Sequence, residues 1–278
     1  MVQARQGFYL STLSLSTTRV AIIGGTGFEV GLRVTPGPIV ETKHGKTRID
    51  TGLTSTGNTF FFLPRHGQDH GIAPHRINHR ANIAALRALE TTHVLATTAV
   101  GSLRISLAPT HLVVPDDLID WTGEVTTFFD SADAVRHTDM AEPYSLKLRT
   151  LLIAQLECSP ITDYHKTGTY VSVSGPRYET PAEIRMFAQL GGDIIGMTSA
   201  PEAILCRELG IHYGMVSVVT NYGCGLVADQ TLDHGHVQRA MLNEFPQLAS
   251  LLLRCVDELV GPNEQTSVNK LAQSGITI

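Results

Sequence analysis

A basic pair, Arg65 and His66, follows an apolar run in the segment Leu63-Pro-Arg-His-Gly67. A guanidinium presents a planar fork of N–H donors that matches the oxygens of a phosphate group. Ligands of α/β proteins collect at the carboxyl ends of sheet strands, so a basic pair at such a point predicts an anion site. Because most charged side chains simply face solvent, an ordinary surface corner is the alternative.

Threonines occupy comparable positions, each at or just after a short apolar run that predicts a strand. They are Thr26 in the turn Gly24-Gly-Thr-Gly27, Thr98 at the end of 94–98, and Thr198 after 193–196. Glycines let backbone N–H groups approach an anion, and hydroxyls add further donors. Together with the basic pair, these threonines predict an oxyanion cradle. A purely structural turn at the glycines is the alternative.

The segment Ser174-Gly-Pro-Arg-Tyr-Glu-Thr-Pro-Ala-Glu183 breaks a strand and restarts the chain as a helix. Thr180 is the expected N-cap of that helix and Pro181 its first residue. Tyr178 and Glu179 stand in the break, where an aromatic ring could stack on a heterocycle and a carboxylate could accept its N–H bonds. The alternative is that Glu179 only assists the helix N-terminus.

A further polar group, Asn221, follows the predicted strand 212–220, and His234 stands near the start of the last predicted helix. An amide can donate and accept hydrogen bonds at once, which suits the edge of a base. A lone asparagine after a strand is also a common turn residue, so both readings stay open.

Short β-branched runs alternate with helical stretches and supply the elements that must position these groups. Expected strands cover 20–23, 59–63, 94–98, 111–115, 169–174, 193–196 and 212–220, and expected helices cover 78–89, 145–157, 181–190, 200–209 and 234–260. Strands apolar on both faces predict an α/β fold with a central mixed β-sheet flanked by helices. The Pro- and Gly-rich segment 31–56 predicts loops and short antiparallel strands. We expect a single domain over 19–260.

The composition disfavours several classes of protein. The 278 residues are 42% hydrophobic with a formal charge of −5, which gives no electrostatic reason to expect a nucleic acid as partner. The four cysteines are widely spaced and indicate reduced thiols in a cytoplasmic protein. The sequence has no apolar run of the roughly 20 residues that cross a bilayer, so no membrane partner is expected. Residues 1–18 are expected to be a disordered extension and 261–278 a polar tail.

A dinucleotide site is a weaker interpretation of the glycine turn. That fold requires Gly-x-Gly-x-x-Gly opening a helix. Here Val30 occupies the position of the third glycine, and Pro36 and Pro38 follow where the helix should continue. The turn therefore does not favour an NAD-dependent oxidoreductase.

Taken together, the motifs resemble the purine nucleoside phosphorylase and methylthioadenosine phosphorylase family. The matching segments occur in the family's order between residues 20 and 260: IIGGTG, LPRHG, PHRIN, RANI, TTAVGSLR, MAEPY, SGPRYETPAEIRM, GMTSAPEA and VTNYGCG. The resemblance implies a trimer, in some members a hexamer, with one active site per subunit near the interface. It also implies no metal or organic cofactor, because inorganic phosphate and a nucleoside are the two substrates.

The resemblance assigns roles position by position. Phosphate would be held by Thr26, Arg65, His66, Thr98, Ala99 and Thr198. Met197 would contact the ribose, Tyr178 the base and sugar, Glu179 and Asn221 the purine, and His137 and His234 would approach the 5′ end of the nucleoside. Asn221, Glu179 and His66 would take part in the reaction. One departure is His79, which stands where relatives usually have tyrosine.

Two residues narrow the substrate class. Adenine-specific relatives resemble this chain but carry Ser at the position of Glu179 and Asp-x-Asp where it has Asn221-Tyr-Gly223. Glu179 would accept from N1–H, which hypoxanthine and guanine have and neutral adenine lacks. The expected activity is phosphorolysis of inosine and guanosine in purine salvage, with 5′-methylthioinosine left open. The alternatives are a methylthioadenosine phosphorylase, a hydrolytic nucleosidase and an inactive nucleoside-binding protein.

Overall fold

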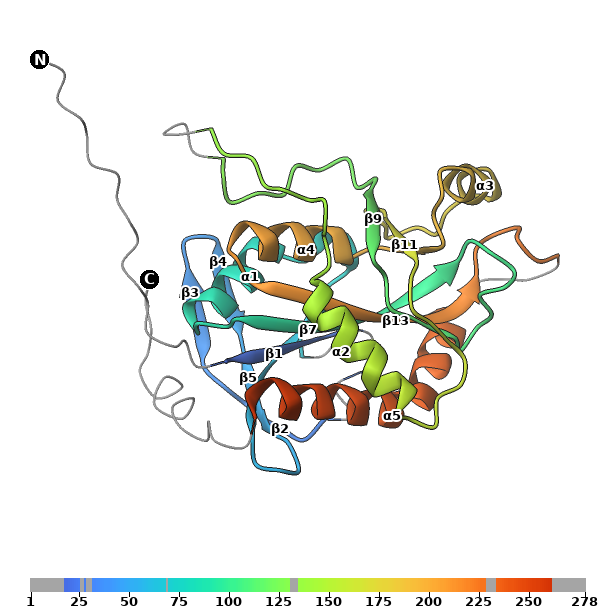
Figure 1. Ribbon diagram of the computed structural model, residues 1–278. Coiled ribbons are helices and arrows are strands. Elements are labelled where there is room, and N and C mark those ends of the chain that lie inside the picture. Colours follow the sequence, from blue (N-terminus) through green and yellow to red (C-terminus); the bar gives the residue numbers. More distant parts are fainter. Residues whose placement is uncertain are drawn as a thin grey trace, which may run out of the picture.

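The computed structural model describes residues 18–25, 28, 32–68, 70–130, 135–228 and 234–261, with backbone alone for 234–245. Within these ranges a mixed sheet of 11 strands carries helices on both faces (Figure 1). The predicted fold class is confirmed. None of the described helices is long and apolar enough to cross a membrane.

The strands are β1 Val20–Gly24, β2 Val34–Thr35, β3 Ile39–Thr42, β4 Gly45–Arg48, β5 Asp50–Leu53, β6 Thr59–Pro64, β7 His93–Ser102, β8 Leu112–Val113, β9 Asp117–Asp120, β10 Tyr164–His165, β11 Thr169–Ser172, β12 Ile194–Gly196 and β13 His212–Tyr222. The helices are α1 His79–Ala88, α2 Leu146–Glu157, α3 Pro181–Gln189, α4 Ser199–Glu208 and α5 His234–Val260. The antiparallel pairs β2–β5 and β3–β4 confirm the expectation for segment 31–56.

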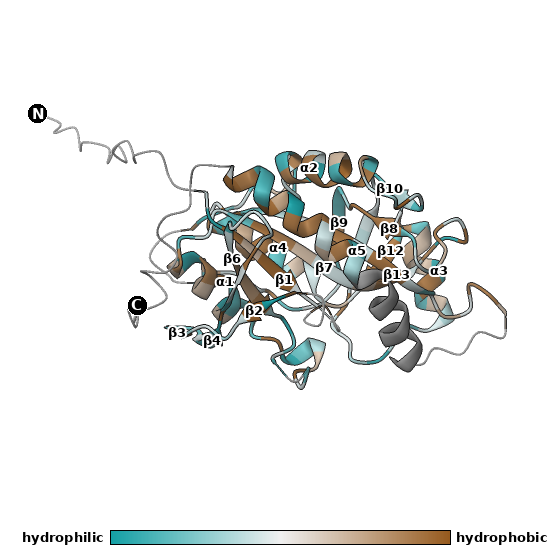
Figure 2. Cartoon of the chain, turned by 90° about the horizontal axis from the view of Figure 1, so that it is seen from below, coloured by the Kyte–Doolittle hydropathy of each residue, from teal (hydrophilic) through white to brown (hydrophobic). Residues whose placement is uncertain are grey.

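Successive side chains of a strand point to opposite faces of the sheet, so the apolar core forms two layers, one on each face. Val94, Ala96 and Met215 face the layer that contains α1 and α4, whereas Leu95 and Val216 face the layer that contains α2 and α5. Figure 2 shows apolar stretches in the central strands, and both apolar and polar residues along α2. The sheet is therefore buried on both faces, as its continuous apolar runs predict.

The centre of the sheet is the long parallel pair β7 and β13. The two strands pair from His93 with His212 to Ser102 with Tyr222, with a bulge between Val219 and Asn221. On its other edge, β7 pairs with β1 only as far as Ala96 and with the antiparallel β12 only from Gly101. Among the described strands, none pairs with residues 97–100 on that edge.

The sequence underestimated both central strands. Thr98, expected as the last residue of its strand, and Ala99, expected just after it, both lie inside β7. Asn221, expected after its strand, lies inside β13. Mutual pairing extends both strands through residues that local propensity assigns to loops. The strand expected over 169–174 ends at Ser172. The short strands β9 and β10 were not expected, since two to four residues give almost no periodic signal.

Asp257 on α5 fastens the turn between β5 and β6. Its Oδ1 accepts hydrogen bonds from Thr54 Oγ1 at 2.6 Å, Thr56 Oγ1 at 2.5 Å and Asn58 Nδ2 at 2.9 Å. Asp257→Ala should therefore lower the free energy of unfolding by about 1–3 kcal/mol. Denaturant titration measures the change, and Glu258→Ala, at the exposed neighbouring position, is the matched control. Equal stability of the two variants would contradict the assignment.

His93, the first residue of β7, makes stability depend on pH. Burial, with Lys147 and His212 nearby, lowers its pKa from 6.5 to about 4. The unfolded chain then binds more protons than the folded one between these values, so stability falls as the pH drops from 6.5 toward 4. His93→Gln should reduce the loss of stability between pH 7 and pH 5 by about 1 kcal/mol. Denaturant titrations at the two pH values measure it, and an unchanged loss would contradict burial of a neutral imidazole.

Candidate active site

A pocket of about 460 Å³ opens at the unpartnered edge of β7. Its lining comes from the ends of β1, β6, β12 and β13, the β11–α3 connection and the loop after β6. The lining residues are Gly25, Arg65, His66, His70, Gly71, Ile72, Ala73, Pro74, Thr98, Ala99, Val100, Gly101, Pro176, Tyr178, Glu179, Ile195, Gly196, Met197, Thr198, Thr220 and Asn221. The structure thus brings together nine of the twelve expected site residues.

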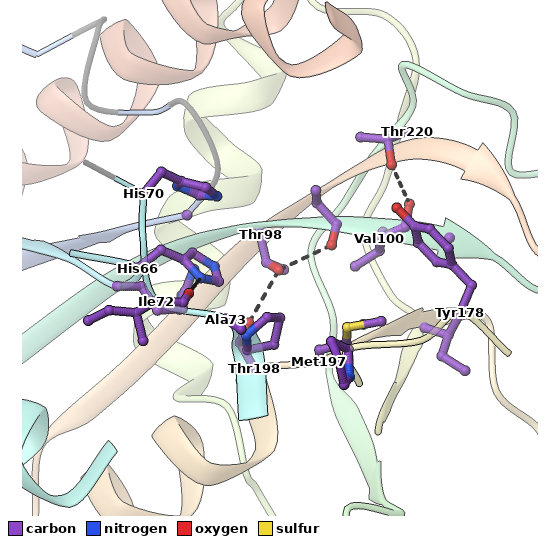
Figure 3. Close-up of a pocket in the computed structure, with 18 of the residues that line it drawn as sticks. His66, His70, Ile72, Ala73, Thr98, Val100, Tyr178, Met197, Thr198 and Thr220 are labelled. Atoms are coloured by element: carbon purple, nitrogen blue, oxygen red, sulfur yellow. Dashed lines mark hydrogen bonds between the residues drawn. The ribbon is translucent and has the colours of Figure 1, made fainter. Parts of the chain in front are cut away.

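Arg65 and the two threonines occupy one end of the pocket. The Oγ1 atoms of Thr98 and Thr198 are 3.5 Å apart, and Figure 3 shows both side chains on the His66 side of the pocket. Thr198 is the N-cap residue of α4, so the positive end of that helix dipole faces the same region. This end presents hydroxyl and N–H donors, which is the chemistry of an oxyanion site.

Gly25 lets Arg65 reach this position. A Cβ at Gly25 would lie 2.8 Å from Arg65 Nη1 and 3.2 Å from the carbonyl oxygen of Thr97. Arg65 Nη1 donates to that same oxygen at 2.8 Å. The glycine after β1 is therefore required by the close approach of the guanidinium, in addition to any role in the turn that follows.

His66 is held in one orientation and one tautomer. Its Nδ1 lies 2.8 Å from the carbonyl oxygen of Ile72 and must carry the hydrogen, since a carbonyl only accepts. Burial and the charge of Arg65 lower the pKa of His66 to about 4. The ring of His70 lies 4.5 Å away, centroid to centroid. At neutral pH, His66 therefore presents an uncharged ring to the pocket.

Glu179 and Asn221 line the other end of the pocket, and each residue is 8% exposed. Burial raises the pKa of Glu179. The capping box of α3 is made by Thr180 with Glu183, whose carboxylate accepts from the Thr180 backbone N–H at 2.7 Å. Glu183 therefore does the capping that was the alternative explanation for Glu179, which is left to line the pocket.

The amide of Asn221 is fixed by its neighbours. Thr220 Oγ1 donates to Asn221 Oδ1 at 2.9 Å, and Asn221 Nδ2 donates to the Tyr222 carbonyl oxygen at 2.9 Å. One Nδ2 hydrogen and one Oδ1 lone pair are not used by these two bonds. Because Asn221 lies within β13, the interpretation as a turn residue is wrong.

Met197 lies between the two ends of the pocket, and Tyr178 lies on the side of Thr220 (Figure 3). Gly175, at φ +67°, allows Met197 to pack against the β11–α3 connection, because a Cβ there would lie 2.4 Å from the Met197 sulfur. Tyr178 is 36% exposed at the pocket wall. An apolar thioether and a partly open ring would suit the face of a sugar and base.

Three expected site residues remain, His137, Thr26 and His234. His137 is exposed and is not among the pocket's lining residues, so the expectation that it belongs to the site is not met within one chain. Thr26 falls outside the described residues, and so does the side chain of His234.

Sequence reasoning missed Glu202 and Thr220. Glu202 is 1% exposed and ion-pairs with Arg65. Its signal was a carboxylate within the apolar run Ala200-Pro-Glu-Ala-Ile-Leu205, where a buried charge requires a partner. Thr220 had no such signal, because its role depends on the bulge that turns its hydroxyl toward Asn221.

Comparison with known proteins agrees with this geometry. The sequence model of the Phosphorylase superfamily matches residues 19–258. A 6-oxopurine nucleoside phosphorylase from Pyrococcus furiosus is 38% identical over 93% of this chain and 99% of its own length. A probable S-methyl-5′-thioinosine phosphorylase from Methanopyrus kandleri is 40% identical over 86% of this chain and 92% of its own.

A solved structure gives the same result. Methylthioadenosine phosphorylase from Schistosoma mansoni, in complex with adenine, superposes with a TM-score of 0.81 at 30% identity. The alignment covers 92% of this chain and 95% of that one. A match to the family model over most of the chain, with relatives of this similarity over nearly their full length, places the chain in the Phosphorylase superfamily.

Proposed function

We propose that this protein cleaves 6-oxopurine nucleosides with inorganic phosphate, releasing the free base and ribose 1-phosphate. The observation that carries the proposal is one pocket with an oxyanion end, at Arg65, Thr98 and Thr198, and a base-reading end, at Glu179 and Asn221. The enzyme is a pentosyltransferase of purine salvage. Relatives named for 6-oxopurine nucleosides and for thioinosine support the same class of base.

The reaction needs no covalent nucleophile from the protein. Departure of the base gives the sugar oxocarbenium character, so positive charge grows on the ribose and negative charge on the purine. Phosphate held by Arg65, Ala99, His66 and the threonines is both the nucleophile and the counter-charge. In this proposal the co-substrate phosphate suffices, and no metal or organic cofactor takes part.

At the base end, donors and acceptors match a 6-oxopurine. The free Nδ2 hydrogen of Asn221 donates to N7 or O6 as negative charge accumulates there, and Glu179 accepts from N1–H. Against adenine, whose N1 is an acceptor, the buried Glu179 carboxylate would stay unpaired at a cost of roughly 1–3 kcal/mol. Inosine and guanosine are thus preferred over adenosine.

The assembly is proposed from the family resemblance, as a homotrimer or a dimer of trimers. Exposed apolar side chains on the segment 121–125 support it, since Trp121 is 54% and Val125 85% exposed. We also propose a cytoplasmic location, which the four free cysteines support.

A substrate panel tests the activity. The purified protein is incubated with inosine, guanosine, adenosine, methylthioadenosine and methylthioinosine, with and without phosphate, and the released base is identified by chromatography. Release of hypoxanthine and guanine only with phosphate is expected, with adenosine slower by about tenfold or more. Faster turnover of methylthioadenosine than of inosine would contradict the base assignment, and phosphate-independent release would indicate a hydrolase.

Asn221→Asp tests the base-reading end. The variant replaces the donor that faces N7 and O6 by an acceptor, so the ratio of kcat/KM for adenosine over inosine should rise by about tenfold or more. Asn78→Asp, the same exchange at the exposed N-cap of α1, is the matched control and should leave the ratio unchanged. If Asn221→Asp also leaves the ratio unchanged, Asn221 does not contact the base.

A further inference from the structure

Glu202 forms a buried ion pair with the arginine of the oxyanion end. Arg65 Nε lies 2.5 Å from Glu202 Oε1, and Nη2 lies 2.9 Å from Oε2, so the pair is bidentate. Both side chains are 1% exposed. Burial of a carboxylate costs several kcal/mol of folding free energy, and its ion pair offsets that cost only when every polar atom is paired. Well-packed hydrophobic residues in place of the pair would give comparable stability. The pair therefore requires an explanation other than stability.

Glu202 is itself held from a second direction. Tyr213 Oη on β13 donates to Glu202 Oε2 at 2.8 Å, and His79 Nδ1 on α1 lies 3.9 Å from Oε1. Burial alone would raise the pKa of Glu202, but the charge and hydrogen bonds of Arg65 lower it overall. The carboxylate thus stays ionised and fixed between α4 and β13.

These contacts determine which way the guanidinium can bind a ligand. Arg65 has five N–H hydrogens, of which two go to Glu202 and one, on Nη1, goes to the Thr97 carbonyl oxygen. Within the part of the chain that the structure describes, one hydrogen on Nη1 and one on Nη2 have no partner. Three hydrogen bonds in its plane keep the guanidinium from rotating. The two remaining N–H donors therefore keep one direction.

Charge alone does not make this end of the pocket attractive to an anion. The charges of Arg65 and Glu202 cancel, and burial lowers the pKa values of both His66 and His79 to about 4, so these rings are neutral near pH 7. Among the described groups at this end, binding of an anion must then rely on aimed N–H and O–H donors. Their orientation matters more than their net charge.

We propose that Glu202 is a positioning residue for phosphate: it orients Arg65 and, held by Tyr213, keeps the two free N–H donors of the guanidinium aimed at the oxyanion end of the pocket. The inference rests on the proposed function, because it assigns phosphate to that end. Glu202 lies in the protein interior and touches no substrate, so it contributes to the reaction only through Arg65.

Glu202→Gln tests the proposal directly. Glutamine keeps the shape but places an amide N–H₂ where one carboxylate oxygen faced Arg65, so the bidentate pair is lost. The KM for phosphate should rise by about tenfold or more, while the KM for inosine changes by less than about twofold. Glu202→Asp retains the charge at a shorter reach and should recover part of the loss. An unchanged KM for phosphate would overturn the proposal.

A double-mutant cycle separates positioning from a general structural role. If Glu202 acts only through Arg65, then Arg65→Gln combined with Glu202→Gln should bind phosphate no more weakly than Arg65→Gln alone. Additive losses would mean that Glu202 acts independently of the guanidinium, which also overturns the proposal.

Tyr213→Phe tests it with a smaller change, should the glutamine variant fail to fold. This variant removes only the hydroxyl that holds Glu202, and the KM for phosphate should rise by about two- to fivefold. The matched control is Tyr144→Phe. Tyr144 is equally buried, with its ring 6.0 Å from that of Tyr213, but its hydroxyl pairs with Ser199 instead. Equal phosphate KM values for the two variants would contradict the role of Glu202.

A binding measurement distinguishes failure of this inference from failure of the proposed function. Phosphate should raise the Tm of the wild-type protein, and the increase should be largely lost in Glu202→Gln. A wild-type protein that phosphate stabilises but that turns over no nucleoside contradicts the proposed function and leaves the positioning role intact. The same increase in Tm in both proteins overturns the positioning role, whatever the activity.

Discussion

The site depends on one feature of the sheet, the stretch of β7 that has a neighbour on only one side. Because β1 pairs with β7 as far as Ala96 and β12 joins only at Gly101, the edge between them is open. Thr98 and Ala99 line the pocket from this stretch. The opening is lined by residues at the ends of β1, β6, β12 and β13. The polar side chains of the site therefore lie together where this edge of β7 is unpaired.

The two ends of the pocket obtain their order in different ways. At the oxyanion end, a buried ion pair and a carbonyl hold the guanidinium of Arg65, and the Ile72 carbonyl holds His66. At the other end, the Thr220 hydroxyl and the bulge in β13 hold Asn221. In both places the side chain that faces the pocket is oriented by a group behind it. Such preorganisation suits stabilisation of a transition state in which charge separates between sugar and base.

Local patterns were enough for the fold class and most of the elements, and together with the family resemblance they gave nine of the residues that face the pocket. They failed where a role arises from pairing between distant segments. Asn221 was expected after a strand, but pairing of β13 with β7 extends the strand past it. Glu202 was overlooked, since its partner is 137 positions away in sequence. His137 was expected at the pocket from resemblance alone, and within one chain it stays exposed.

We propose that one pocket holds phosphate at the Arg65 end and a 6-oxopurine at the Glu179 and Asn221 end. A crystal structure of the protein with phosphate and guanine tests it most directly. We expect the anion within hydrogen-bonding distance of Arg65, Thr98 and Thr198, and N1 of the base facing Glu179, with its N7 edge toward Asn221. An anion bound away from Arg65, or a base that contacts neither Glu179 nor Asn221, would contradict it.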